Sequence, residues 1–134
     1  MIAGTEWIVD ANGCRPDALR DLALLKAVFK RVVTELQLQV VDEILWHQFP
    51  PPGGLTGMAL LSESHLTCHT YPEYGLATIN LYCCRSRPEW PWAQFLRDFL
   101  GAQDVSVRAV ERHAAIPDLP TLKHSLQFAL AKES

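Results

Sequence analysis

Leu61-Ser62-Glu63-Ser64-His65-Leu66-Thr67-Cys68-His69-Thr70-Tyr71-Pro72-Glu73 is the stretch around which the rest of the chain is organised. It brings acid, hydroxyl, imidazole, thiol and aromatic side chains together within thirteen residues, between apolar segments that are typical of a sheet. A plain core strand rarely carries so many polar and reactive groups. The stretch therefore indicates a sheet protein whose chemistry lies on or beside one strand.

Helical periodicity is clearest after Asp21, which is a suitable N-cap residue. Apolar residues recur there at intervals of three and four, at Leu25, Val28, Phe29, Val32 and Leu36. A second helix is predicted over residues 88–100, because Gly101 follows it where a C-cap glycine belongs. A short terminal helix is predicted within residues 114–134.

Strands are predicted over residues 5–11, 38–49, 56–62, 76–84 and 104–110, with turns at Asn12-Gly13, at the Pro/Gly loop 50–54 and at residues 72–75. Two main helices are too few to cover both faces of such a sheet. We therefore expect an α+β fold, a two-layer sandwich with a mainly antiparallel sheet and helices on one face. The other face is then either wet or buried against a second copy.

Composition excludes several classes of protein. The length of 134 residues is typical of a single domain. The net charge of −3 provides no excess of positive charge to bind the phosphates of a nucleic acid. No apolar run approaches the roughly 20 residues that span a bilayer, and the first residues do not resemble a signal peptide, so a cytoplasmic location is expected. Without a secretory context, the four cysteines are expected to be free thiols.

Three interpretations of the motif follow from the residues alone. Ser64 could be a nucleophile that is activated by His65 or His69. Zinc could be bound by nitrogen and sulfur ligands drawn from His65, Cys68, His69, Cys83 and Cys84. The third interpretation is a half-buried strand with satisfied polar groups. No Cys-x-x-Cys pair supports zinc, and no Gly-x-Ser-x-Gly elbow supports a hydrolase.

A family resemblance adds to this reading. Ser-Glu-Ser-His-Leu-Thr-x-His-Thr-Tyr-Pro-Glu-Tyr-Gly, residues 62–75, resembles the self-processing motif of the prokaryotic S-adenosylmethionine decarboxylases, which are pyruvoyl enzymes of polyamine (spermidine) biosynthesis. The lead-in at residues 47–57 and the segment 77–84 also resemble this family, as does Gly13-Cys14. The similarity covers roughly residues 4–112.

The resemblance implies a proenzyme of one domain, residues 1–134, that cleaves itself between Glu63 and Ser64. The products are fragments 1–63 and 64–134, and Ser64 becomes a covalent pyruvoyl group. His69 matches a histidine that assists processing, and Thr56 stands where the family usually has a processing serine.

The resemblance also implies how substrate is handled, without a metal. The pyruvoyl carbonyl forms a Schiff base with the substrate amine and accepts the electrons released with carbon dioxide. Cys84 matches the proton donor, with Cys83 as the competing thiol. Phe49 and Tyr71 match aromatic residues that flank adenine, and Glu73 matches an acid near the ribose. The family forms homodimers by packing one sheet against another.

Some residues depart from the family pattern: Ala11 and Asn12 replace aromatic positions, Asn80 replaces an aspartate, and Arg85 replaces a glycine. A related pyruvoyl-dependent ornithine or arginine decarboxylase is therefore one alternative. An unprocessed homologue that acts as a binding or regulatory partner is another.

Strand geometry raises one further point about the motif. Ser64 and His69 have opposite parity, so an ideal strand turns their side chains to opposite faces. Processing therefore requires a bend or bulge near the motif, or help from another strand.

Overall fold

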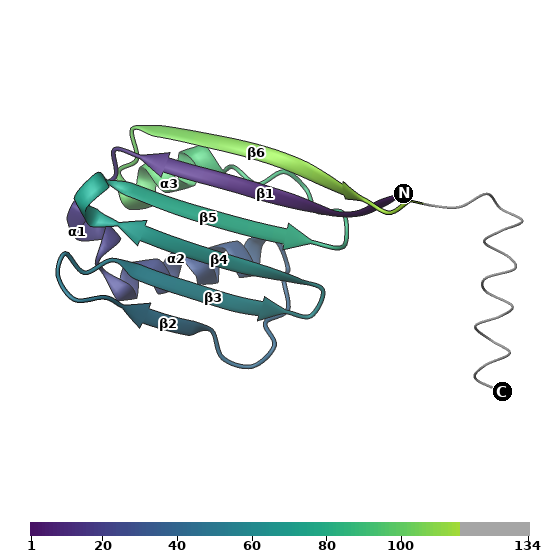
Figure 1. Cartoon of the computed structure of the whole chain (residues 1–134), viewed down its shortest axis with the longest axis horizontal. Coiled ribbons are helices and arrows are strands. Elements are labelled where there is room, and N and C mark those ends of the chain that lie inside the picture. The colour runs from purple at the N-terminus through teal and green to yellow at the C-terminus, as the bar shows by residue number, and fades with distance from the viewer. Residues whose placement is uncertain (116–134) are drawn as a thin grey trace, which may run out of the picture.

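Six strands form one antiparallel sheet in the order β2-β3-β4-β5-β1-β6, in a computed structural model that describes residues 1–115 (Figure 1). The strands are β1 (Ile2–Asn12), β2 (Leu45–Gln48), β3 (Leu55–Leu61), β4 (Ser64–Tyr71), β5 (Leu76–Cys83) and β6 (Asp104–His113). The helices are α1 (Pro16–Leu19), α2 (Leu22–Glu35) and α3 (Trp92–Leu100), with a 3-10 turn η1 at Pro72–Tyr74.

Helices α2 and α3 cover the same face of the sheet (Figure 1). The Asp21 side chain accepts a hydrogen bond from the Leu24 N–H and so caps α2, as predicted. Leu25, Val28, Phe29 and Val32 of α2 are buried. Helix α3 ends at Gly101 in the left-handed region (φ 69°), where glycine is favoured. The predicted two-layer α+β architecture is confirmed.

Side chains of the central strands alternate between two environments. In β4, Leu66, Cys68 and Thr70 are buried beneath the helices, whereas His65, Thr67 and His69 lie on the other side. We call the side of the sheet that carries none of the helices of residues 1–115 the open face. Part of it is apolar, because Met58 and Leu60 of β3 project onto it and are exposed.

The predicted strands and helices differ from the structure in several places. The motif is a strand of its own, β4, which is joined to β3 by a two-residue turn at Ser62-Glu63. The predicted strand 38–49 shortens to β2 and one isolated pairing, Val40 with Leu61, since Asp42 adopts a left-handed conformation (φ 63°). The helix predicted from residue 88 begins at Trp92.

Proline explains the late start of α3. Pro88 and Pro91 have no backbone N–H and disfavour helical conformation in the residue before them, so Pro91 serves as the N-cap. The short helix α1 was not predicted. Most of the predicted terminal helix lies outside the described residues. Within residues 1–115, no helix has the length and apolar character needed to cross a membrane.

Thr70 ties three elements of the fold together. Its buried hydroxyl donates to the Leu19 carbonyl oxygen of α1 (2.6 Å) and accepts from the Leu55 N–H of β3 (2.9 Å). These bonds hold β4 to the start of β3 and to α1.

We predict that Thr70→Val lowers the free energy of unfolding by about 1–3 kcal/mol, because it leaves a buried carbonyl and a buried N–H without partners. Chemical denaturation measures the loss. Thr67→Val is the matched control, since Thr67 lies on the open face of the same strand. Equal stabilities for the two variants would contradict the proposed role of the hydroxyl.

Candidate functional site

The Glu63–Ser64 peptide bond joins the β3–β4 turn to the first residue of β4. Leu61 pairs with Ser64 across the turn, and Ser64 pairs with Cys83 at the end of β5. The Cys84 N–H donates to the Glu63 carbonyl oxygen at 3.2 Å. We call this group, Glu63, Ser64 and Cys84, the cleavage end. A backbone donor therefore already points at the carbonyl that precedes Ser64.

Two neighbouring thiols at the cleavage end have different surroundings. Cys83 is buried on the helix-covered face, and burial raises the pKa of its thiol, while Arg87 nearby and a hydrogen bond from Ser64 lower it in part. Cys84 is exposed. The sequence favoured Cys84 through the resemblance, but the register places Cys83 directly across from Ser64.

The remaining predicted site residues gather around a cleft of about 360 Å³ at the other end of β4. The cleft is lined by Phe49, Thr56, His69, Tyr71 and Glu73, together with Pro50, Pro52, Gly54, Leu55 and Thr70. It combines exposed aromatic rings with one carboxylate and one imidazole. Such a site suits a ligand with a flat ring and hydroxyl groups.

His69 is oriented by its cross-strand partner. The Thr56 hydroxyl lies 3.0 Å from His69 Nδ1 and donates to it when that nitrogen is unprotonated. This contact orients the ring and leaves Nε2 available to exchange a proton. The threonine in place of the family's serine thus keeps the hydroxyl at the histidine.

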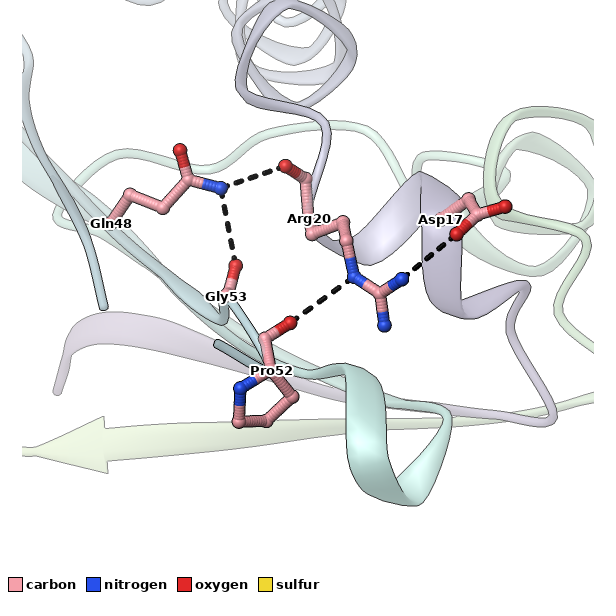
Figure 2. Close-up of polar contacts among 5 residues, drawn as sticks. All are labelled: Asp17, Arg20, Gln48, Pro52 and Gly53. Carbon is pink, nitrogen blue, oxygen red and sulfur yellow. Dashed lines mark hydrogen bonds and ion pairs between the residues drawn. The ribbon is translucent and has the colours of Figure 1, made fainter. Parts of the chain in front are cut away.

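The Pro/Gly loop that carries Phe49 is held by α1 and the residue that follows it (Figure 2). Arg20 Nε donates to the Pro52 carbonyl at 3.1 Å and pairs with Asp17 at 2.9 Å. Gln48 Nε2 donates to the carbonyls of Arg20 (2.9 Å) and Gly53 (3.3 Å). No pattern in the sequence identifies Arg20 and Gln48, because the bonds that join α1 to the loop are made to backbone carbonyls 28 to 32 residues away.

Gly54 brings the same loop against β4. A Cβ at this position would lie 2.5 Å from the Thr70 carbonyl oxygen. Only glycine permits this approach. The close packing fixes one wall of the cleft.

The predicted site residues thus divide between the two ends of β4. Pairing of β4 with β5 runs without interruption from Ser64–Cys83 to Tyr71–Leu76, so the bend or bulge considered from the sequence is not present. Five residues of regular strand place Ser64 and His69 about 16 Å apart. Their side chains also face opposite sides of the sheet.

The same alternation separates the ligands of the zinc interpretation. His65 and His69 lie on the open face, while Cys68 and Cys83 lie beneath the helices. Burial raises the pKa of Cys68 to about 12, so its thiol stays protonated near neutral pH. Residues 1–115 contain no cluster of three histidine, cysteine or acidic side chains that could hold a metal ion.

Within residues 1–115, neither histidine of the activated-serine interpretation has its ring on the side of the sheet that Ser64 faces. His65 stacks on Tyr82 on the open face (ring centroids 5.6 Å apart), and His69 is at the far end of the strand. The structure therefore leaves Ser64 beside a carbonyl and a thiol.

Comparison with known proteins identifies the family of the chain. The family model for S-adenosylmethionine decarboxylase matches residues 5–113. A chain named S-adenosylmethionine decarboxylase proenzyme from Geobacillus sp. (strain WCH70) is 35% identical over 100 residues, which cover 75% of this chain and 79% of that one. One of the same name from Parasynechococcus marenigrum (strain WH8102) is 31% identical, over 95% of this chain and 98% of that one.

A solved structure shares the fold. The crystal structure of the adenosylmethionine decarboxylase from Aquifex aeolicus superposes with a TM-score of 0.72 at 24% identity, over 87% of this chain and 96% of that one. The family model covers most of the chain, including both ends of β4. The chain therefore belongs to the S-adenosylmethionine decarboxylase family.

Proposed function

We propose that this protein is a proenzyme that cuts its own chain between Glu63 and Ser64 and then decarboxylates S-adenosylmethionine. The observation that carries the proposal is the placement of the Glu63–Ser64 bond in a tight turn, with its carbonyl oxygen on the Cys84 N–H. A donor at this oxygen stabilises the negative charge that develops when a hydroxyl attacks the carbonyl carbon.

Self-cleavage needs no reagent except water. The Ser64 Oγ attacks the Glu63 carbonyl carbon, the C–N bond breaks, and the nitrogen takes a proton to leave an ester. Loss of the Ser64 α-proton then breaks the Cβ–O bond and releases the Glu63 carboxylate. The residue that remains takes up water and loses ammonia, which leaves a pyruvoyl group on fragment 64–134.

The residues present fit that group. Ser64 is the first residue of β4, and its partners Leu61 and Cys83 are the last residues of β3 and β5, so a new chain end there affects only the final pair of each ladder. The pyruvoyl carbonyl supplies an electron sink for decarboxylation. The exposed Cys84 is the proton donor in this proposal, and the buried Cys83 is the neighbour that holds the Ser64 position.

The cleft provides the binding groups for substrate. Phe49 and Tyr71 are 51% and 36% exposed and provide aromatic surface for adenine. The Glu73 carboxylate can accept hydrogen bonds from ribose hydroxyls. These are the roles that the family resemblance implies for the three residues.

A second copy of the chain would bridge the distance along β4 that separates the two ends. If two open faces pack together with β4 running antiparallel over its copy, the cleft of one protomer lies over the cleavage end of the other. His69 and Thr56 then assist the cleavage of the partner, and each complete site draws on two chains. The exposed apolar side chains of the open face, Leu45, Met58 and Leu60, support such packing.

Intact-mass spectrometry tests the self-cleavage. We predict that the purified protein separates into fragments 1–63 and 64–134, and that Ser64→Ala remains a single chain because the attacking oxygen is absent. Cys84→Ala should still be cleaved, with slower release of carbon dioxide from labelled S-adenosylmethionine. Labelled ornithine and arginine are the comparison substrates. A wild-type protein that remains a single chain would refute the proposed self-cleaving enzyme. Release of carbon dioxide from ornithine or arginine alone would refute S-adenosylmethionine as the substrate.

Mixing two defective chains tests the shared site. We predict that His69→Ala is cleaved slowly by itself and much faster after co-expression with Ser64→Ala, which supplies an intact His69 from the partner. The control partner is the double variant Ser64→Ala/His69→Ala, which has no histidine to offer. Different affinity tags identify the cleaved chain by mass. Equal cleavage with either partner would show that His69 does not act between chains.

A further inference from the structure

Arg85 makes a direct contact with the residue that precedes the scissile bond. Its Nε lies 2.6 Å from Glu63 Oε2. Glu63 is in the β3–β4 turn, and Arg85 follows β5, so the ion pair joins two segments that lie just beyond the last ladder pair, Ser64 with Cys83. The cation in place of the family's glycine is therefore directed at the turn.

A second contact holds the same residue. The Cys84 N–H donates to the Glu63 carbonyl oxygen at 3.2 Å, so adjacent residues at the end of β5 hold the carboxylate and the carbonyl of Glu63. Two points of attachment restrict rotation of residue 63 far more than one. The carbonyl is thereby kept where the N–H can stabilise an oxyanion.

We propose that Arg85 is a positioning residue for self-cleavage. Its ion pair with the Glu63 side chain keeps the Glu63 carbonyl oxygen hydrogen-bonded to the Cys84 N–H. This inference rests on the proposed cleavage at Glu63–Ser64. The pair is solvent-exposed, with 71% of the Arg85 side chain and 34% of the Glu63 side chain accessible. Exposed pairs contribute little to folding stability, so the effect of Arg85 falls on the rate of cleavage.

The Arg85–Glu63 ion pair also has a role after the Glu63–Ser64 bond is broken. Glu63 then ends fragment 1–63 and carries two carboxylates, and β3 is no longer joined to β4. The Arg85 guanidinium has five N–H donors and can bind both carboxylates. Apart from these contacts, the turn is held by the Ser62 N–H, which donates to the Gln39 carbonyl at 2.9 Å.

The test compares cleavage rates of newly made protein by intact-mass spectrometry. We predict that Arg85→Met and Glu63→Gln each slow the appearance of fragment 1–63 by about three- to fivefold, the size of an exposed ion pair and less than the loss of an oxyanion donor outright. The double variant should be no slower than either single variant, because both changes remove one contact. Arg85→Lys should recover part of the rate.

The salt dependence of the cleavage rate is a second measurement. A purely structural role of Arg85 would not change this dependence. At about 1 M salt the screening length falls to about 3 Å, so wild-type cleavage should slow toward the rate of Arg85→Met, while the variant changes little. Matched controls are Arg31→Met and Glu35→Gln, which break an ion pair of the same 2.6 Å length on α2. Neither should alter cleavage.

In the mature protein, carboxypeptidase should remove Glu63 faster from Arg85→Met than from wild type. If wild type is cleaved and Arg85→Met matches it in rate, salt response and trimming, the role of Arg85 is refuted while the proposed function stands. If wild type is not cleaved at all, the proposed function is refuted, and the role of Arg85 with it.

Discussion

The unbroken pairing of β4 with β5 is the constraint on which the rest of the structure depends. From Ser64–Cys83 to Tyr71–Leu76 each residue has one partner, and no extra residue interrupts the ladder. Because side chains alternate along a strand, this register sends Cys68 and Thr70 into the core and His69 onto the open face. A slip of one residue would exchange the two sets and bury imidazoles under the helices.

Local signals in the sequence were enough to predict several elements of the fold. The N-cap at Asp21, the left-handed glycine at Gly101 and the turn at Asn12-Gly13 each depend on a residue and its immediate neighbours. The β3–β4 hairpin could not be found in this way. Ser62-Glu63 contains no Gly, Asn or Asp, the residues that mark two-residue hairpins, so pairing of β4 with its neighbours sets the turn. The interruption of the strand predicted over residues 38–49 likewise depends on Asp42, which adopts a left-handed conformation (φ 63°) that breaks the strand.

The sequence was enough to propose the residues of the candidate site, but not which of them lie near one another. Parity alone indicated that Ser64 and His69 could not meet on a straight strand, and the structure keeps them at opposite ends. The contact of Cys83 with Ser64 follows from the strand register, which periodicity does not reveal. The Arg85–Glu63 pair has the same origin, since the two residues are far apart in sequence and meet only where β5 ends beside the turn.

The distribution of charge on the open face bears on how two copies would pack. The β2–β3 half is apolar, with Leu45, Met58 and Leu60, whereas the β1–β6 half carries the ion pairs Glu6–Arg112 (3.7 Å) and Asp10–Arg108 (4.0 Å). A two-fold axis that runs across the strands sets each strand over its own copy and exchanges the ends.

That axis stacks apolar side chains on apolar side chains and leaves the ion pairs facing one another. An axis parallel to the strands would instead set the apolar half over the charged half, at the cost of burying charges against groups that cannot pair with them. It would also leave each cleavage end over another cleavage end. The packing proposed for a shared site, with each strand over its own copy, is thus the one that the side chains of the open face favour.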